Sequence, residues 1–315
     1  PIEKLSISKL LLEELKIDRI EVASARVSEG EMKAVKLITD WAKDSGFDDK
    51  IEILSFVDEG SSIKWMEKSG AKTQNLLTKG SINHLKNQIK KTPSQHFRDI
   101  SKVIQYAEDQ GIRTNVYLED WSNGMKNSKS YVMDMVEFLS EKTVDRILLP
   151  DTLGVLTPAL TKEFIKDITN NYPNIHFDFH AHNDYDLSVA NVIESIRNGC
   201  KGIHITVNGM GERAGNAPLA SVVAVVNDFL TGYKIDVNEK SLHKVSKLVS
   251  NFSGFRIPVN KPIVGDNVFT QTAGIHADGD NKKNLYFNDL LPERFGRKRK
   301  YALGKMSGKA NIKKN

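Results

Sequence analysis

The sequence predicts an α/β protein, a (β/α)8 barrel followed by a small C-terminal appendage of helices and loops. Short apolar runs alternate with amphipathic segments from the start of the chain to about residue 230, which is typical of parallel strands joined by helices. Polar residues also stand at the ends of different strands, namely Glu119, Asp151, His182 and Asn208. Barrel enzymes carry their sites at the carboxyl ends of the strands, so this distribution favours a barrel.

The elements follow in order along the chain. Helices are recognised by apolar residues three and four positions apart, and strands by short apolar runs. The expected helix–strand pairs are 2–15 and 19–24, 31–43 and 50–56, 62–69 and 73–78, 96–110 and 113–119, 130–141 and 146–150, 160–171 and 176–182, and 188–198 and 202–208, with a last helix at 218–230.

These pairs supply seven strands, whereas a (β/α)8 barrel needs eight. Because the chain opens on a helix, we expect the first strand to lie upstream of these 315 residues. A doubly wound open sheet is the alternative architecture. We expect residues 1–232 to form the barrel and residues 233–315 to form a C-terminal linker subdomain that is also cut short.

Composition narrows the class of protein. A hydrophobic content of 39% and a charged content of 27% are typical of soluble globular proteins. No apolar run approaches the roughly 20 residues of a membrane span, and the start lacks the order of a secretion signal. Cys200 is the single cysteine, so no internal disulfide is possible, and we expect a buried, inert thiol. A cytoplasmic protein without a membrane partner is expected.

The net charge of +5 does not indicate a nucleic-acid partner. Acidic and basic residues alternate through most of the chain, as they do on solvated helix faces. The exceptions are the basic run 297–300 and the pair Lys313-Lys314. A solvated face is the preferred interpretation of both, with contact to an anionic cofactor phosphate or to nucleic acid as the alternatives.

The segment 176–182 ends in two histidines and supplies the strongest chemical signal. Side chains two apart on a strand point to the same side, so His180 and His182 present two imidazoles together. This is how a strand offers two ligands to one metal ion, and Asn183 and Asp184 can support such ligands. The alternative is a histidine pair that only forms hydrogen bonds within a core.

A glycine-rich segment at 208–216 follows the next strand. Gly209, Gly211 and Gly215 let the backbone approach a ligand closely. The alternative is an ordinary loop before the helix that starts near Pro218, with Asn216 as its N-cap.

Three further residues are candidates for chemistry. Glu119 ends a strand, where it can act as a general acid or base near the metal, or simply pair with a nearby Arg or Lys. Thr152 ends the next strand and can donate a hydrogen bond to a substrate carboxylate. His276 lies between glycines, outside the barrel.

The motif His-x-His-Asn-Asp at 180–184, followed by Asn-Gly-x-Gly-Glu-Arg-x-Gly-Asn at 208–216, resembles the α-isopropylmalate, homocitrate and citramalate synthases of the DRE-TIM metallolyase group. The resemblance runs across essentially the whole chain and is greatest to citramalate synthase. It implies a Claisen-type condensation of acetyl-CoA with a 2-oxo acid, followed by hydrolysis of the thioester. It also implies a homodimer, in which the appendage of one subunit reaches the barrel of the other.

By this resemblance, a divalent metal, zinc or manganese, is bound by His180 and His182, with Asn216 as a further or water-mediated contact. The metal would hold the 2-oxo acid and polarise its carbonyl. Thr152 would hold the substrate carboxylate. The acid–base machinery would consist of Glu119 and His276, with Tyr286 nearby.

One departure from the family pattern stands out. The family has an Arg-Asp-Gly motif at the end of the first barrel strand, whose Asp binds the metal and whose Arg stabilises the oxyanion. Here the only Arg-Asp pair is Arg98-Asp99, within an expected helix. We interpret the missing motif and strand as an N-terminal truncation, and expect this polypeptide to be inactive or badly impaired. By the same resemblance, we expect the family's C-terminal regulatory domain to be missing from this polypeptide too.

The substrate is predicted from residues at strand ends. Leu54, Leu77 and Tyr117 match the pattern of citramalate synthase, which converts pyruvate to (R)-citramalate in isoleucine biosynthesis. The alternative is 2-isopropylmalate synthase, which uses 2-oxoisovalerate in leucine biosynthesis. Remoter alternatives are an acyl-CoA lyase, which uses a catalytic cysteine in a glycine loop, and a pseudoenzyme that binds a metabolite without catalysis.

Overall fold

The structure is a computed structural model that describes residues 1–314, and the chain folds into two compact units. The first unit comprises residues 1–12 and 17–218, and the second comprises residues 13–16 and the chain from Leu219 onward. The sequence suggests a domain boundary near residue 232, whereas this division assigns the helix α10, Leu219–Phe229, to the second unit.

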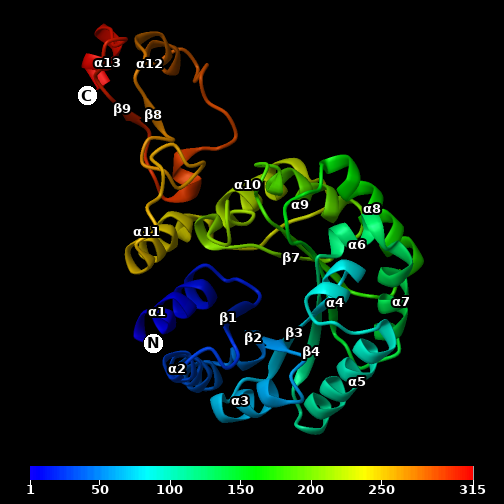
Figure 1. Cartoon of the computed structure of the whole chain (residues 1–315). Helices are drawn as coiled ribbons and strands as arrows, with labels where there is room; N and C mark the ends of the chain where they lie inside the picture. Colours follow the sequence, from blue (N-terminus) through cyan, green and yellow to red (C-terminus); the bar gives the residue numbers. More distant parts are fainter. Residues whose placement is uncertain (315) are drawn as a thin grey trace. The chain divides into compact units, whose positions relative to one another are not determined.

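One parallel sheet forms the centre of the first unit, and its strands follow chain order from β1 to β7. The strands are β1 Ile20–Ser24, β2 Ile51–Phe56, β3 Thr73–Lys79, β4 Arg113–Glu119, β5 Arg146–Asp151, β6 Phe177–Ala181 and β7 Gly202–His204. Figure 1 shows this sheet curling round with helices on its outside. A doubly wound sheet would reverse its strand order at a switch point, so the alternative is excluded and the predicted barrel architecture is confirmed.

Nine α-helices belong wholly to the described part of the first unit. They are α1 Ile2–Lys9, α2 Glu29–Ser45, α3 Ser61–Ser69, α4 Ile82–Asn87, α5 Pro93–Asp109, α6 Trp121–Asn127, α7 Lys129–Ser140, α8 Pro158–Asn171 and α9 Ser188–Arg197. Side chains cap the starts of several: Ser28, Ser81, Thr92 and Thr157 each accept a hydrogen bond from a backbone N–H three residues on. Such caps satisfy donors that a helix start leaves free.

The structure differs from the expected elements in three places. The short helices α4 and α6 were not expected, because six or seven residues show too little periodicity to be recognised. The first helix ends at Lys9 and continues as a π-helical turn over Leu10–Glu14. The strand expected at 202–208 ends at His204, and the chain then forms a 3-10 turn over Val207–Gly209 in which Asn208 is left-handed, with φ of 60°.

Alternate residues of each strand divide between two environments. Val116, Leu118, Ile147 and Leu149 are almost fully buried and belong to the apolar core. Among their sequence neighbours on the other face of the sheet, Asn115 and Arg146 are polar and contact one another across the barrel. The apolar core therefore lies on the outer face of the sheet, where the helices pack, and the inner face carries polar side chains together with apolar ones such as Leu77 and Leu148.

Deep in the barrel, side chains from six strands form a continuous network that we call the inner polar layer. Its members are Glu21, Glu52, Asn75, Asn115, Arg146 and Asp178. Arg146 forms ion pairs with Glu52 and Asp178, and its Nε donates to Asn115 Oδ1 at 3.2 Å. Asn75 Nδ2 donates to Glu21 at 2.6 Å and to Glu52 at 3.0 Å. Burial raises the pKa of Glu21.

The second unit consists of short elements. They are α10, the 3-10 turn Glu239–Ser241, α11 Leu242–Ser253, β8 Thr270–Gln271, α12 Gly274–Asp280, the 3-10 turn Pro292–Phe295, β9 Lys300–Tyr301 and α13 Lys309–Lys314. The strands β8 and β9 pair in parallel. Arg294 ties the unit together through ion pairs with Asp228 and Glu239. None of the helices in residues 1–314 has the length and apolar character that crossing a membrane requires.

Candidate functional site

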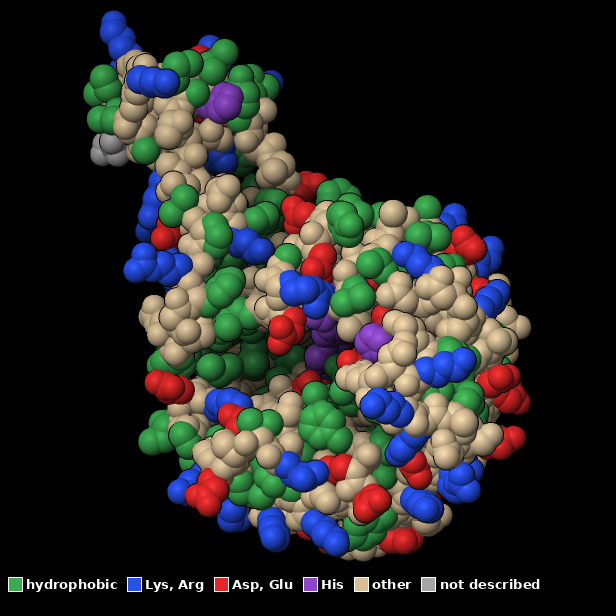
Figure 2. All heavy atoms as spheres, viewed as in Figure 1, with side chains coloured by type: hydrophobic (Ala, Val, Ile, Leu, Met, Phe, Trp, Pro, Cys, Tyr) green, Lys and Arg blue, Asp and Glu red, His purple; other side chains and the backbone are tan. Residues whose placement is uncertain are grey.

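His180 and His182 lie side by side at the end of β6, as the alternation predicted. Their ring centroids are 5.1 Å apart. Figure 2 shows histidine side chains in a hollow of the first unit, with acidic and basic side chains around it. Burial, together with the rings of His204 and His182, holds the pKa of His180 well below its usual value. Burial and the charge of Arg213 lower the pKa of His182. Neutral imidazoles are the form that binds metals.

Asn216 stands directly beside His182. The two residues form an isolated antiparallel bridge, and Asn216 Nδ2 donates to Met210 O at 3.3 Å. The helix α10 begins three residues later, at Leu219, so the alternative of an N-cap role for Asn216 is wrong. The loop needs its glycines, because a Cβ at Gly215 would lie 2.0 Å from Gly209 O and one at Gly211 would lie 2.5 Å from Asn216 Nδ2.

An arginine–carboxylate pair fixes the same loop. Arg213 donates from Nε and Nη2 to the two oxygens of Asp184, at 2.7 and 2.8 Å, and also to Thr152 O at 2.8 Å. The hydrogen bond from Arg213 lowers the pKa of Asp184, which keeps the carboxylate ionised. The ends of β5 and β6 are thereby joined to the glycine-rich loop, as a bidentate pair of this kind holds a fixed geometry.

Glu119 has a charged partner that the sequence suggested only in general terms. Its carboxylate forms an ion pair with Lys79, and the two residues are register partners on β4 and β3. Lys79 is itself fixed, since its backbone N–H donates to His96 Nε2 at 3.1 Å and its carbonyl accepts from Tyr131 Oη at 2.8 Å. Glu119 is therefore held in a defined position.

Thr152 lies next to this pair along the mouth of the barrel. Its Oγ1 accepts a hydrogen bond from the backbone N–H of Asp120 at 2.8 Å. Asp120 has a φ of 64° and its carboxylate accepts from Ser81 Oγ at 2.7 Å, so the donor is well anchored. A hydroxyl that accepts one bond still has its own hydrogen to donate.

Two of the three predicted wall residues are neighbours. Leu77 and Tyr117 are register partners on β3 and β4, while Leu54 of β2 pairs with Asn75. Tyr117 is buried and its hydroxyl lies 3.0 Å from His204 Nδ1, so its ring cannot swing away. Burial, with the charges of Glu21 and Glu52, raises the pKa of Tyr117.

His276 and Tyr286 meet within the second unit. Their ring centroids are 4.2 Å apart, and His276 Nδ1 lies 2.9 Å from Gln271 Oε1. A Cβ at Gly279 would lie 2.4 Å from Tyr286 Cε2, which explains the glycine. The nearby basic run is not simply a solvated face: Arg297 donates to Ile263 O at 2.9 Å and to Gly265 O at 2.6 Å, and Arg299 forms an ion pair with Asp280.

Sequence reasoning missed Lys79 and His204. Lys79 ends a strand, as Glu119 does, and that shared position was the available signal. His204 has no local signal beyond its place on β7, because its importance comes from its alignment with His180 across two strands.

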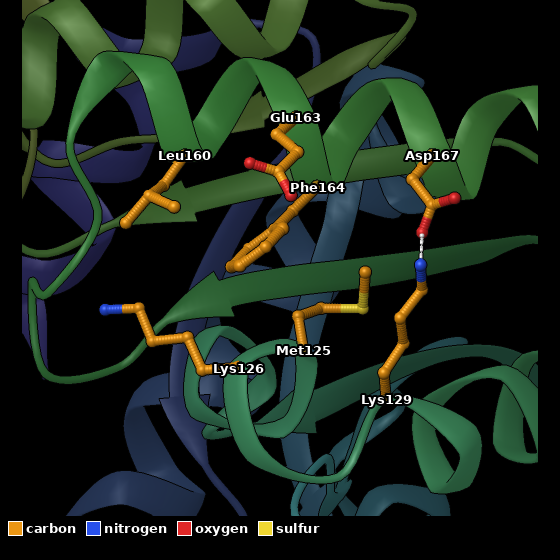
Figure 3. A pocket seen from close by; sticks show the side chains of 7 residues that line it. All are labelled: Met125, Lys126, Lys129, Leu160, Glu163, Phe164 and Asp167. Carbon is orange, nitrogen blue, oxygen red and sulfur yellow. Dashed lines mark ion pairs between the residues drawn. The ribbon is translucent and has the colours of Figure 1, made fainter.

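Other features of the first unit offer less chemistry. A hollow of about 410 Å³ lies among α6, α7 and α8, lined by Met125, Lys126, Lys129, Leu160, Glu163, Phe164 and Asp167 (Figure 3). Lys129 and Asp167 form an ion pair at 2.8 Å across one end of it. Cys200 is buried, and burial raises the pKa of its thiol, so an inert thiol is the appropriate description.

The described residues supply some, but not all, of the ligands that a divalent metal needs. His182 Nδ1 and Asn216 Oδ1 are buried and have no hydrogen-bond partner among the described residues, which is expensive unless something else satisfies them. Two imidazoles and an amide oxygen suit zinc or manganese. Within residues 1–314, however, no cluster of three or more His, Cys, Asp or Glu residues could hold a metal, so a full set of strong ligands is not assembled there.

Comparison with known proteins supplies the family. Residues 2–249 match the HMGL-like family, and residues 263–315 match the family described as homocitrate synthase post-HMGL domain-like. Two solved hydroxymethylglutaryl-CoA lyases share the fold. The enzyme from Bacillus subtilis has a TM-score of 0.68 at 18% identity, with 84% of this chain and 89% of that chain covered. The enzyme from Pseudomonas aeruginosa has a TM-score of 0.65 at 18% identity, with 81% and 87% covered.

Curated relatives are nearer in sequence. The chain is 35% identical to the (R)-citramalate synthase of Methanocaldococcus jannaschii, over 99% of this chain and 62% of the relative. It is 36% identical to a probable 2-isopropylmalate synthase of Ignicoccus hospitalis, over 98% of this chain and 75% of the relative. It is 37% identical to the homocitrate synthase of Sulfolobus acidocaldarius, over 74% of this chain and 49% of the relative. The chain therefore belongs to the HMGL-like family, among the citramalate, isopropylmalate and homocitrate synthases of the DRE-TIM group, as its motifs predicted.

Proposed function

We propose that this protein condenses acetyl-CoA with a 2-oxo acid, using a divalent metal, zinc or manganese, held by His180, His182 and Asn216. The observation that carries the proposal is the pair of imidazoles at the end of β6, together with two buried atoms, His182 Nδ1 and Asn216 Oδ1, that have no hydrogen-bond partner among the described residues. The chain spans 62% of the citramalate synthase relative and 49% of the homocitrate synthase relative. The activity is therefore proposed from the residues of this chain and is not taken over from the names of the relatives.

The residues have distinct roles in this proposal. A bound divalent metal would polarise the carbonyl of the 2-oxo acid as a Lewis acid. The Thr152 hydroxyl, oriented by Asp120 N–H, donates its hydrogen to the substrate carboxylate. The Glu119 carboxylate, held by Lys79, removes a proton from the acetyl methyl group. The resulting carbon nucleophile bonds to the carbonyl carbon, the carbonyl oxygen gains a proton, and water then cleaves the thioester to a carboxylate and CoA thiol.

Pyruvate is the proposed oxo acid, and (R)-citramalate the product. Leu54, Leu77 and Tyr117 would surround the substrate side chain, and the hydrogen bond from Tyr117 to His204 prevents the ring from making room for a larger group. Identities of 35% and 36% do not separate citramalate from isopropylmalate synthases, and the steric argument is what supports the proposal of pyruvate. The alternative is 2-oxoisovalerate, which the isopropylmalate relatives favour.

A homodimer completes the proposal. The second unit exposes several large apolar side chains, namely Ile275, Leu285, Leu303, Met306 and Ile312. If these side chains gather into one patch, such a surface is of the kind that another chain covers. We infer that His276 and Tyr286 of one copy serve the barrel of the other, where His276 shares proton abstraction with Glu119.

The test uses the full-length protein. Release of CoA thiol is measured with acetyl-CoA and pyruvate, 2-oxoisovalerate or 2-oxoglutarate, before and after chelation and re-addition of zinc or manganese. We expect metal-dependent turnover that is fastest with pyruvate, and loss of both metal and turnover in His182→Ala. The control is His176→Ala, which removes a histidine just before β6 and should keep both. Full metal content and activity in His182→Ala would show the ligand assignment to be wrong.

The dimer has its own test. Glu119→Gln and His276→Asn are each expected to be nearly inactive alone. When the two variants are mixed and allowed to exchange subunits, one site of each mixed dimer has both native residues, so activity returns. Absence of recovery in a mixture shown to contain mixed dimers would contradict sharing of the site between copies.

A further inference from the structure

Gln271 and His276 form a side-chain pair within the second unit. Gln271 Oε1 lies 2.9 Å from His276 Nδ1, and both residues are half-buried. The ring of Tyr286 packs against the same imidazole, at a centroid distance of 4.2 Å. An amide on one nitrogen and an aromatic ring beside it thus fix the direction of the imidazole.

Gln271 is anchored by the strand that carries it. It ends β8, is the register partner of Tyr301 on β9, and its carbonyl accepts a hydrogen bond from Ala302 N–H at 2.9 Å. The Tyr301 hydroxyl donates to Asp280 Oδ2 at 3.0 Å, and Asp280 ends the helix α12 that carries His276. The strand pair and the helix are therefore joined at a second point besides the contact between Gln271 and His276.

Tyr286 belongs to the same frame. Arg299 donates from Nη2 to the carbonyl oxygen of Tyr286 at 3.1 Å. It also donates to the two carboxylate oxygens of Asp280, at 2.6 and 3.0 Å. The groups that contact the imidazole of His276 are thus tied to the end of its own helix.

The hydrogen on the imidazole follows from the atom that faces it. An amide oxygen can only accept, so Nδ1 of His276 carries the hydrogen of this contact. A neutral imidazole has one hydrogen, so its Nε2 is bare and has a lone pair that can take a proton. An amide turned over would instead donate to a bare Nδ1 and place the hydrogen on Nε2, so the two arrangements have opposite consequences.

We propose that Gln271 is a positioning residue for His276: its side-chain oxygen accepts the Nδ1–H and so keeps Nε2 bare for proton abstraction. This rests on the proposed function, in which His276 of one copy and Glu119 of the other share removal of a proton from acetyl-CoA. When that proton passes to Nε2, the electron pair of the methyl C–H bond stays with the acetyl group and the ring becomes a cation. Its Nδ1–H still donates to Gln271, a neutral amide that gains no proton, so the ring keeps its direction through the step.

The first measurement locates the ring hydrogen in full-length protein with ¹⁵N-labelled histidine. It is made in alkaline buffer, where imidazoles are neutral, and His276→Asn identifies the signals of His276. We expect the hydrogen on Nδ1 in the wild type and in Gln271→Glu, because a carboxylate can only accept. In Gln271→Leu, which offers no acceptor, a large part of it should move to Nε2. A wild-type His276 with its hydrogen on Nε2 would overturn the proposal without any variant.

The second measurement separates substrate binding from turnover, through kcat and KM with acetyl-CoA and pyruvate. We expect Gln271→Leu to lower kcat by about ten-fold, near the upper worth of one neutral hydrogen bond, and to leave KM for pyruvate unchanged. Gln271→Glu should bring kcat back to within a few-fold of the wild type. Thr272→Val is the control, since it removes an exposed hydroxyl next to Gln271. Unchanged kcat in Gln271→Leu, or equal losses in the Leu and Glu variants, would refute the positioning role.

The two levels of inference fail differently. If His276→Asn keeps full turnover, His276 is not a base and the proposed sharing of proton abstraction is lost. If His276→Asn is inactive but kcat and the ring hydrogen are unchanged in Gln271→Leu, only the role of Gln271 is lost. Should Gln271→Leu not fold, the hydrogen positions in the wild type and in Gln271→Glu decide alone.

Discussion

The inner polar layer and the mouth of the same barrel contain similar residues that are satisfied to different degrees. In the inner layer each carboxylate accepts a hydrogen bond from Arg146 or Asn75, and the one inner-layer oxygen without a hydrogen-bond partner among the described residues, Asp178 Oδ1, still lies 2.9 Å from His176 Nε2. At the mouth, His182 Nδ1 and Asn216 Oδ1 have no partner in the described part of the chain. Buried charges that satisfy one another serve structure, whereas unsatisfied atoms at strand ends are available to a ligand.

Breaking the inner layer should have the largest effect on stability. Arg146→Met removes the buried cation that Glu52 and Asp178 share and leaves Glu52 only the more distant Arg19, at 3.5 Å, which should lower the free energy of unfolding by about 3–5 kcal/mol. Urea unfolding followed by circular dichroism measures the change. Arg26→Met is the control, since its pair with Asp58 is at the surface and should cost about 0–1 kcal/mol.

A compensating variant sharpens this test. Adding Glu52→Gln and Asp178→Asn to Arg146→Met removes the unpaired charges, so part of the lost stability should return. If Arg146→Met alone unfolded at the same urea concentration as the wild type, the inner polar layer would have no structural role.

The ion pair between Lys79 and Glu119 at the mouth should affect both stability and kcat, because Glu119 is proposed to act as the general base. Glu119→Gln should lower kcat by about 10²–10⁴-fold, the usual range for loss of a general base, and should also leave the buried Lys79 unpaired. In Lys79→Met with Glu119→Gln, we expect stability to recover while kcat stays low. Turnover and urea unfolding are measured on the same full-length proteins. Recovery of kcat together with stability would show that the pair is only structural.

The sequence predicted the parts of the molecule that depend on local pattern. Short apolar runs predicted the strands, and the alternation in 176–182 predicted that His180 and His182 lie together, which the structure confirms. The partners of Glu119 and His180 were not predictable, because Lys79 and His204 reach them only through strand register. Register in a curled sheet depends on the whole barrel, and no short window of sequence encodes it. The metal assignment itself stays a prediction.

The stability of the folded chain should depend on pH through His96, which holds the backbone of Lys79 at the mouth of the barrel. Its Nε2 accepts from Lys79 N–H at 3.1 Å, and burial lowers its pKa from 6.5 to about 4. Between these values the unfolded chain binds the extra proton and the folded chain does not, so stability falls as pH drops from 6.5 to 4 and is retained above 6.5. The full loss is about 3 kcal/mol, from 1.36 kcal/mol per pKa unit.

Other groups also titrate in that range, so the measurement compares the stabilities of two proteins that differ only at His96. Urea unfolding is compared between the wild type and His96→Gln at pH 7.5, 5.5 and 4.5, three chosen conditions on either side of the expected transition. We expect the stability of the wild type relative to His96→Gln to decline as pH falls. A difference independent of pH would mean that His96 is protonated alike in both states.

The smallest expected effect concerns the choice of substrate, and it separates the two faces of one strand. Leu77 is the register partner of Tyr117 on the inner face. Its branched side chain should fill the space around the substrate side chain, so that binding an isopropyl group there costs about 1–3 kcal/mol. Leu77→Ala should therefore narrow the preference in kcat/KM for pyruvate over 2-oxoisovalerate by about ten-fold or more. Its neighbour Leu76 is fully buried in the outer core. Leu76→Ala should lower stability by about 2–5 kcal/mol and leave the substrate ratio of the folded protein unchanged. If the kcat/KM ratio of pyruvate to 2-oxoisovalerate changed equally in both variants, specificity would depend on general loosening of β3. Faster turnover of 2-oxoisovalerate by the wild type would identify an isopropylmalate synthase and would leave the proposed metal site and condensation unaffected.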